Sequence, residues 1–354
     1  MIYNGNYYND TLYGTSNNQK VLVETTDNAI YLSCELEVIF NGEVWAHVFE
    51  IPFFNNMAEF YFENFIHSII TQKFTVDQMD KDNYKFLHFE FASIRMVLKE
   101  MIENDILDQQ ELSFSMTLGS YDAISLSEIE QGNQYLLPIS NTSLLTKKGI
   151  VSFSFVSQNL PEILIVSDGV NESQIGLTPS ETSWKLHCLT IPIKNILSQG
   201  SDELTLSLKF GQTIIALGKF IIIGAAIDHT MVTYQNEFGT LSIIEFIGEL
   251  KQEQNYKFGE FKHRKNNRSI LSTTSIEKNK LYMVNTGYIL DSLKYEMLSD
   301  LLKSFNTYLW DTDLKKMIVA RSQRLKPYRS NYYLNNETIK FKLSENDDIL
   351  HRIF

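Results

Sequence analysis

Residues 230–250, TMVTYQNEFGTLSIIEFIGEL, most constrain what this chain can fold into. Two apolar segments, Met231–Tyr234 and Leu241–Ile247, flank a polar segment with Asn and Gly, the residues that adopt positive backbone dihedral angles most easily. This pattern predicts a β-hairpin. Apolar residues crowd both faces of the second segment instead of alternating, which is typical of a strand that is covered on both sides. We expect the hairpin to open a C-terminal domain into which the preceding modules lead.

The length and the composition predict several β-rich domains. A chain of 354 residues is long enough for two or three domains that each bury a core. The 23 Phe and 18 Tyr favour sheets. We therefore predict a mostly β fold with a few helices, in which tandem β-sandwich-like modules are followed by a C-terminal α+β domain. The expected boundaries are an N-terminal arm at 1–19, a β-rich module with helices at 20–143, a β-sandwich-like module at 144–228 and an α+β assembly domain at 229–354.

The expected arm and the first module differ in their patterns. Residues 1–19 are rich in Asn, Tyr and Gly and show no period, so we expect a mobile arm or a segment that becomes ordered on a partner. In the first module, Asn41-Gly42 is a strong hairpin signal, and Pro52 ends the second strand of that hairpin. Apolar residues at helical spacing predict helices within Met57–Thr71 and Ile94–Leu107. The strands expected here are Lys20–Val23, Ala29–Phe40, Glu43–Ile51, Tyr84–Phe91 and Leu112–Leu118.

Glycine-containing turns at sandwich-like intervals divide the second module into short strands. The strands that contain His47 and His187 both run into Ile-Pro and a short apolar segment, which suggests two similar β-modules in tandem. Cys34 and Cys188 form no CxxC pair and are expected to be buried thiols in strands. The strands expected here are Ile150–Val156, Glu162–Val166, Trp184–Ile191, Leu204–Phe210 and Thr213–Ile223.

The third module combines strands with one helix. Asp291 or Ser292 caps a predicted helix that runs to Ser304 and has one apolar face. Asp311-Thr312-Asp313 is expected to be a turn between two strands, with the alternative that its oxygens hold a cation. The strands expected here are Phe258–His263, Thr307–Trp310, Lys316–Arg321 and Thr338–Leu343.

Charge is distributed unevenly along the chain. Residues 251–330 contain 16 basic and 8 acidic residues, a net charge of +8, whereas residues 1–250 contain 12 basic and 31 acidic residues, a net charge of −19. Two separately folded surfaces of different character would explain this difference. Head-to-tail docking between copies, or docking onto an acidic neighbour, would explain it equally well. Nucleic acid is not an expected partner, because the whole chain is acidic and repels phosphate.

Motifs of catalysis and ligand binding are missing from the sequence. It contains no GxSxG, Walker-type phosphate loop, GxGxxG, HExxH or EF-hand loop, and its His residues show no HxH or HxxxH spacing. Carboxylates two residues apart, Glu35/Glu37 and Glu128/Glu130, fit a glycosidase pair, but a solvated sheet edge explains them as well. We expect no catalytic, cofactor-binding or metal-binding residues and no cofactor. A signal peptide and an apolar stretch long enough to span a membrane are also not visible.

Two basic segments are candidate interfaces. The cluster KHRKNNR at 262–268 lacks the interleaved aromatic residues of single-strand binders, which favours a protein-docking patch or a solvated loop. The segment at 321–333 combines Arg and Tyr, which suit the rim and the core of a protein interface. The interface candidates are Arg264, Lys265, Arg268, Arg321, Arg324, Tyr328, Arg329, Tyr332 and Tyr333.

Three segments carry a family resemblance. Val232–Gly248 has two strands joined by Asn-x-x-Gly, Gly287–Trp310 with the following LKKMIVA has a helix, a strand and a turn, and Glu35–Ile70 has a hairpin, a proline stop and a short helix. They resemble a loosely defined group of virion proteins from tailed phages of Bacteroidota, including crAss-like phages. Tyr234, where an indole is commoner, and Phe238-Gly239, in place of Gly-Gly, depart from the group's pattern and leave the position in the particle open.

The resemblance implies a non-enzymatic structural protein of the tail, baseplate or neck, which is synthesised in the host cytoplasm and ends up in the virion. Its partners would be further copies of itself, in a ring-like homo-oligomer, and neighbouring virion proteins. One alternative is a carbohydrate- or receptor-binding adhesin, because tandem sandwiches can present aromatic platforms to sugars. A lesser alternative is a glycoside hydrolase.

Overall fold

Strands dominate the structure. The computed structural model describes residues 1–15, 20–25, 28–73, 80, 82–119, 124–125, 135–136, 144–157, 159–169, 171–178, 185–197, 201–224, 229–265, 268–287, 289, 292–304, 306–310, 314–319, 325, 336–343 and 349–350. The chain is 62% strand, its described part has two α-helices, and the strands form several separate small sheets. The prediction of a mostly β fold in tandem modules is confirmed.

The first part of the chain forms two facing sheets and a helix. One sheet has six strands in the order β10-β2-β9-β8-β4-β5, and the other has three in the order β1-β3-β6. Alternation in β4 buries Leu32, Leu36 and Val38, together with the covering helix residues Ile66 and Ile70, in one apolar core. The elements are β1 (Ile2–Tyr3), β2 (Thr11–Gly14), β3 (Val21–Glu24), β4 (Tyr31–Phe40), β5 (Glu43–Pro52), β6 (Met57–Phe60), α1 (Glu63–Lys73), β8 (Ala92–Ile102), β9 (Asp105–Thr117) and β10 (Ile124–Ser125).

Two helix predictions in this part need correction. The segment expected to be a helix from Ile94 is the strand β8, because Ile94, Met96 and Leu98 also fit a two-residue period and β4 and β9 pair with the strand on both sides. The helix expected from Met57 starts only at Glu63, since Met57–Phe60 pairs with β3 as β6. The hairpin predicted at Asn41-Gly42 is confirmed by β4 and β5.

The expectation of a mobile N-terminal arm at 1–19 is wrong for residues 1–15, and residues 16–19 lie outside the described part of the chain. Residues 2–3 pair with β3, and residues 12–14 run parallel to β9. Tyr7 and Tyr13 are fully buried and pack against Phe114, so the aromatic residues of this segment complete a core of their own chain. The hydroxyl of Tyr7 donates a hydrogen bond to the buried carboxylate of Glu63 at 2.9 Å.

Two further sheets form the second part. A four-stranded sheet has the order β11-β13-β16-β7, and a five-stranded sheet has the order β12-β18-β17-β14-β15. The five strands predicted here are confirmed, and β7 joins them from the range predicted for the first module. The elements are β7 (Lys85–Phe89), β11 (Tyr135–Leu136), β12 (Leu144–Thr146), β13 (Ile150–Ser157), β14 (Ile163–Ser167), β15 (Glu172–Gly176), β16 (Lys185–Pro192), the 3₁₀ helix η1 (Ile193–Asn195), β17 (Glu203–Phe210) and β18 (Thr213–Ile223).

The third part is one sheet with a helix packed on it. The strand order is β20-β19-β23-β24-β25-β22-β21, and β26 pairs with β22. Helix α3 buries Met297, Leu298 and Leu301 against the sheet, which confirms the predicted helix. The elements are β19 (Thr230–Gln235), β20 (Leu241–Phe246), β21 (Leu250–Lys265), β22 (Arg268–Asn285), α3 (Ser292–Lys303), β23 (Thr307–Trp310), β24 (Leu314–Val319), β25 (Thr338–Leu343) and β26 (Ile349–Leu350).

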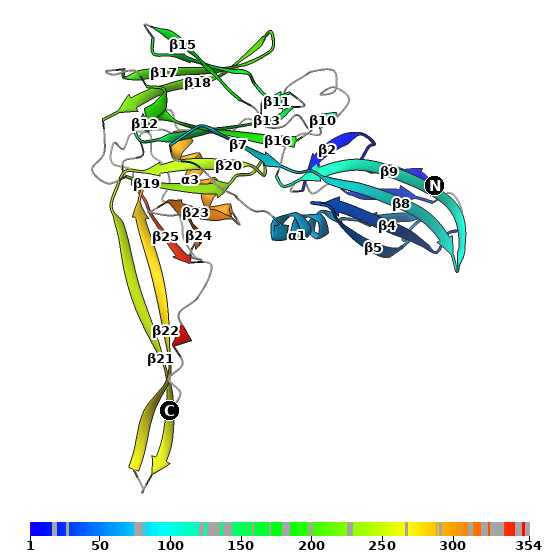
Figure 1. Ribbon diagram of the computed structural model, residues 1–354. Coiled ribbons are helices and arrows are strands. Elements are labelled where there is room, and N and C mark those ends of the chain that lie inside the picture. The colour runs from blue at the N-terminus through cyan, green and yellow to red at the C-terminus, as the bar shows by residue number, and fades with distance from the viewer. Residues whose placement is uncertain are drawn as a thin grey trace.

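Figure 1 shows how these parts are arranged in space. The hairpin of β19 and β20 lies where the parts meet, with the sheets of the second part above it and the six-stranded sheet to its right. The long hairpin of β21 and β22 leaves this junction and points away from the rest of the molecule.

Candidate functional site

The β19–β20 hairpin is the structural centre of the protein. All residues of both strands are buried, as expected for strands that are covered on both sides. Val232 and Ile244 join the core under α3, and Ile243 packs with Ile150 of β13. Leu241 belongs to the core of the first part. Residues of one hairpin therefore join three apolar clusters, one in the first part, one under α3 and one at the contact with β13.

The turn of this hairpin is buried and held by one side chain. The side-chain oxygen of Asn236 accepts hydrogen bonds from the backbone N–H groups of Phe238 and Thr240 at 3.0 and 3.1 Å. Its amide group donates to the hydroxyls of Thr240 and Ser242, both at 3.0 Å. This arrangement satisfies polar groups of a turn in which Asn236, Phe238, Gly239 and Thr240 are buried and Glu237 is exposed.

Gly239 brings the turn into backbone contact with the end of β9. Its φ is +77°, and a Cβ atom at this position would lie 1.8 Å from the carbonyl oxygen of Leu118. A Cβ on Gly119 would likewise meet the backbone of Phe238 at 2.5 Å. Both positions therefore require glycine, and the contact holds the β19–β20 hairpin against the six-stranded sheet.

A buried carboxylate fixes the hairpin to the second part. Glu245 of β20 accepts a hydrogen bond from the N–H of Thr146 at 3.1 Å and lies 3.4 Å from the imidazole of His229. A Cβ atom on Gly149 would collide with the same carboxylate at 1.6 Å. The turn between β12 and β13 thus fits around Glu245.

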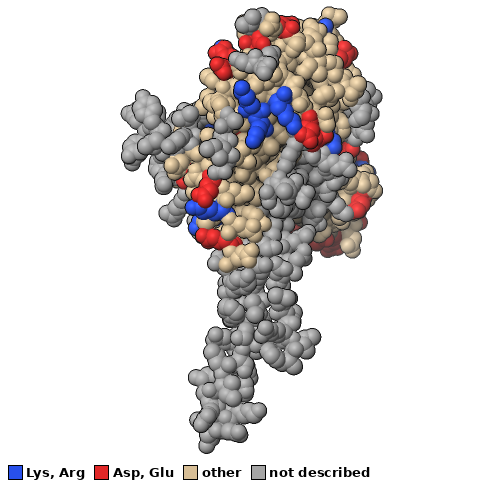
Figure 2. All heavy atoms as spheres, turned by 60° about the vertical axis from the view of Figure 1, so that its left-hand side comes forward, with Lys and Arg blue, Asp and Glu red and all other residues tan. Residues whose placement is uncertain are grey.

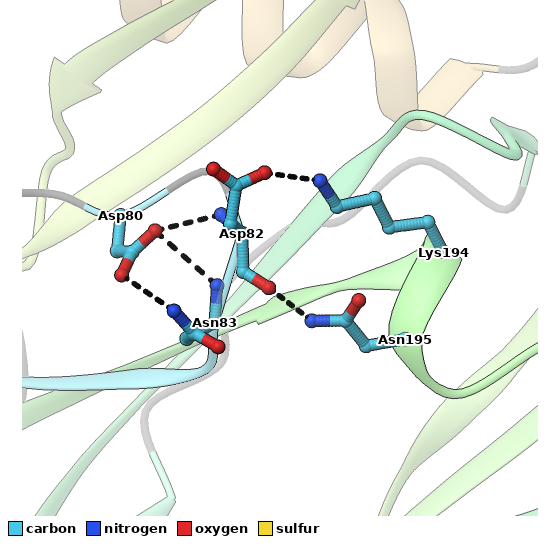
Figure 3. A network of polar contacts seen from close by, with 5 residues as sticks. All are labelled: Asp80, Asp82, Asn83, Lys194 and Asn195. Carbon is cyan, nitrogen blue, oxygen red and sulfur yellow. Dashed lines mark hydrogen bonds and ion pairs between the residues drawn. The ribbon is translucent and has the colours of Figure 1, made fainter.

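Polar contacts anchor β7 in the sheet of the second part (Figure 3). Asp80 accepts hydrogen bonds from the N–H groups of Asp82 and Asn83 at 2.7 and 3.3 Å and from the amide of Asn83 at 3.0 Å. Lys194 forms an ion pair with the Asp82 carboxylate, and the amide of Asn195 donates to the Asp82 carbonyl. The loop before β7 is therefore fastened to η1 at the end of β16.

A cavity of about 230 Å³ lies between the β19–β20 turn and α3. Burial, followed by the charge of Glu237, raises the pKa of Asp300 to about 6, and burial raises the pKa of Tyr234 well above its usual value. The cavity is smaller than most small-molecule sites, which enclose roughly 300–1,000 Å³. The lining residues are Tyr234, Asn236, Glu237, Phe238, Ser242, Glu296, Met297, Ser299, Asp300 and Lys303.

The described residues hold no group of three or more His, Cys, Asp or Glu side chains that could bind a metal ion. Cys34 and Cys188 are buried free thiols in β4 and β16, as predicted, and burial raises their pKa to about 12 and about 11. Neither α1 nor α3, the helices that the structure describes, has the length and the apolar character of a membrane span.

The candidate interface residues lie in two places. Lys265 pairs with Arg268, and Arg264 pairs with Ser269, so the predicted basic loop is the tip of the β21–β22 hairpin. The predicted strand from Phe258 to His263 is part of the much longer β21. The other interface candidates, Arg321, Arg324, Tyr328, Arg329, Tyr332 and Tyr333, lie outside the described residues. The turn predicted at 311–313 also lies outside them.

Within the described part of the chain, most of the β21–β22 hairpin has no neighbouring strand. The strand β25 pairs with residues 281–285 of β22, and Leu281 faces Glu253 of β21. Residues 254–280 therefore extend beyond β25, and β26 pairs with only Ile276 and Glu277 of this extension. We call residues 254–280 the ribbon. With 12 residues on its first strand, it reaches about 40 Å at the rise of a β-strand.

A second surface was missed by the sequence analysis. β5 is an edge strand, and on the outer face of the six-stranded sheet its Val44 and Val48 are 60% and 54% exposed, beside Ile39 of β4 at 42%. Glu37 and Glu50 lie on the same face, as the register of β4 and β5 shows. We call the outer face of β4, β5, β8 and β9 the acidic sheet face. The signal in the sequence was a strand with apolar residues on both faces, VWAHVF, next to a terminating Pro52.

Charges of both signs lie close together elsewhere on the molecule. Figure 2 shows the molecule with the left-hand side of Figure 1 turned forward. On this side the body of the protein carries Lys or Arg and Asp or Glu side chains in small mixed groups. The acid excess is found in the first part instead, where residues 1–119 contain 18 acidic and 6 basic residues.

Comparisons with known proteins leave the family open. No protein-family model matches the chain. No curated protein matches it in sequence. Among solved structures, the chain is similar to a Ca²⁺-stabilized adhesin that helps an Antarctic bacterium bind ice, with 7% identity over 79% of this chain and 70% of the adhesin chain. The TM-score of 0.16 is too low for this likeness to carry an argument about fold or function.

Proposed function

We propose that the chain is a non-enzymatic structural component of a phage virion, in the tail, baseplate or neck, that joins neighbouring subunits through its surfaces. The resemblance of Val232–Gly248 and Gly287–Trp310 to phage virion proteins supports this proposal. The first of these segments contains most of the central hairpin, and the second contains α3, which packs on the hairpin, and β23, which pairs with β19.

The ribbon is the observation that carries the proposal. A two-stranded hairpin is at best marginally stable alone in water, because it has no third strand or helix to cover it. Over residues 254–280, only Ile276 and Glu277 pair with another described strand, β26. A basic element of this length that reaches away from the body is suited to contact with another subunit.

Particles purified from the phage that encodes this chain provide the test. Mass spectrometry of density-purified particles is expected to find its peptides, and antibodies against the body are expected to label the tail, the baseplate or the neck in electron micrographs. Peptides found only in the lysate of infected cells, and never in particles that carry the other virion proteins, would refute the proposal. Binding of the isolated chain to host polysaccharide, together with absence from particles, would favour the adhesin alternative.

A further inference from the structure

We propose that the ribbon of one copy docks on the acidic sheet face of a second copy of this chain. This inference rests on the proposed role in assembly and adds the partner and the surface. The ribbon and the sheet face come from different parts of the molecule, and in Figure 1 the ribbon points away from the six-stranded sheet. A copy therefore leaves its own sheet face open to a neighbour.

Charge favours this pairing. The hairpin at 250–285 contains eight Lys or Arg and three Glu residues, a net charge of +5, and its tip at 262–268 contains four basic and no acidic residues. Residues 1–119 carry a net charge of −12. Complementary fields accelerate association and determine its orientation.

The acidic sheet face keeps an acid excess after its internal ion pairs. Arg95 pairs with Glu111 at 2.6 Å, and Lys99 pairs with Glu35. Among the described residues of this face, Glu37 and Glu50 are the acidic residues that remain after the two basic residues are paired. Asp105 adds an exposed carboxylate at the adjoining β8–β9 turn.

The same face also offers apolar area. Val44 and Ile39 face each other in the ladder, and Val48 lies further along the same face of β5. An exposed apolar patch with a polar border is typical of a protein interface. The ribbon sequence supplies matching residues, since Tyr256, Phe258 and Phe261 alternate with or adjoin its basic residues.

The ribbon and the sheet face are two different surfaces, so two arrangements satisfy the contact. Reciprocal exchange of ribbons gives a two-fold dimer, and head-to-tail docking gives a ring when the rotation between copies allows closure and a filament otherwise. The inference therefore predicts self-assembly, and the measured mass distinguishes these arrangements.

Charge reversal in the full chain tests this contact. One variant carries Lys262→Glu, Arg264→Glu and Arg268→Glu in the ribbon, a second carries Glu37→Lys, Glu50→Lys and Asp105→Lys on the sheet face, and a third carries both sets. A control carries three reversals at exposed positions in the five-stranded sheet and its flanks, Glu162→Lys, Glu172→Lys and Asp202→Lys. Analytical ultracentrifugation at low and high salt measures the mass of the assemblies.

We expect the wild-type chain and the control to assemble at low salt and to dissociate as salt screens the charges. The ribbon variant and the sheet variant are each expected to remain monomeric, whereas their mixture and the third variant are expected to assemble again. Circular dichroism checks that every variant is folded, and a variant that unfolds is replaced by the corresponding Gln or Asn substitutions.

Three results would overturn the inference: a monomeric wild-type chain at every concentration, a ribbon or sheet variant that still assembles, or a folded third variant that does not recover assembly. The proposed role in the virion is tested separately from this contact. If the chain is present in particles but monomeric in solution, only the proposed docking between copies is contradicted. If the chain assembles in solution but is absent from particles, only the proposed role in the virion is contradicted.

Discussion

The protein contains two adjacent hairpins in opposite environments. The strands β19 and β20 are buried along their whole length and join three apolar clusters, whereas the hairpin of β21 and β22 leaves the body after a few residues. The two are separated by only a short segment of chain, so the difference does not come from their place in the sequence. The turns differ: one packs against the backbone of Leu118, and the other carries the basic cluster at 262–268. Hairpin formation is local, but the location of a hairpin depends on what its turn and faces can contact.

The largest effect is expected from Gly239→Ala. The new Cβ atom would overlap the Leu118 carbonyl, so the hairpin would have to move away from the six-stranded sheet. We expect a loss of about 4 kcal/mol in the free energy of unfolding. Gly42→Ala is the matched control, because Gly42 has the same φ of +77° but a Cβ atom there would meet nothing within 4 Å. The control is expected to lose about 1–2 kcal/mol from backbone strain alone. Equal losses in urea denaturation would show that the contact with β9 does not matter.

Asn236→Ala is expected to have the next largest effect. It removes the acceptor of two backbone N–H groups in a buried turn, as well as two contacts to hydroxyls. We expect a loss of about 2–3 kcal/mol. Asn236→Asp keeps the acceptor and loses the amide donor, so it separates these two contributions. A loss below about 0.5 kcal/mol for the Ala variant, measured by urea denaturation, would contradict the role of this side chain.

Asp300→Asn is expected to stabilise the protein at neutral pH. The pKa of Asp300 in the folded protein, about 6, is above the ordinary value of 3.8, so folding disfavours its charged form. The native contribution of this group is therefore complete in acid and is lost as the pH rises through about 6. Because the carboxyl is partly exposed and solvent screens the effect, we expect a gain of about 1 kcal/mol at pH 7.5.

The advantage of the Asp300→Asn variant should shrink as the pH falls toward 4. Thermal unfolding of both proteins across this range measures the difference. Glu296→Gln provides a comparison at an exposed position on the same helix. A variant that is less stable than the wild type at pH 7.5 would show that the ionised carboxyl stabilises the turn through the N–H of Glu237.

The smallest effect on stability is expected from removal of the ribbon. Joining Gln254 to Lys280 through Asn-Gly preserves the pairs that the two strands make near β25 and supplies a suitable hairpin turn. We expect the unfolding free energy of the body to change by about 0.5 kcal/mol or less, because only Ile276 and Glu277 of the ribbon pair with a described strand outside the hairpin. Assembly, in contrast, is expected to be lost. A large drop in the melting temperature would mean that the ribbon belongs to the fold and would remove the contrast between the two hairpins.

Prediction from the sequence succeeded where the signal is local. The Asn-Gly turn between β4 and β5, the central hairpin and the helix α3 follow from turn residues and from spacing along a short segment. The candidate site was only partly predictable. The net positive charge of residues 251–330 pointed to the region that contains the ribbon. No local pattern distinguished the outer face of β5 from a buried face, because apolar residues occupy both faces of this strand.

The sequence by itself determined the mostly β character, the β4–β5 and β19–β20 hairpins, the buried thiols and the uneven distribution of charge, because these depend on residue type and short-range spacing. Only the tertiary structure decided that β8 is a strand, that β7 pairs with β16, and that residues 1–15 complete a core. It also decided that Gly239 touches Leu118 across more than a hundred residues of chain. The physical reason is that a strand acquires its hydrogen-bond partners and its second covered face from segments far away in the sequence, and no local period specifies which segments these are.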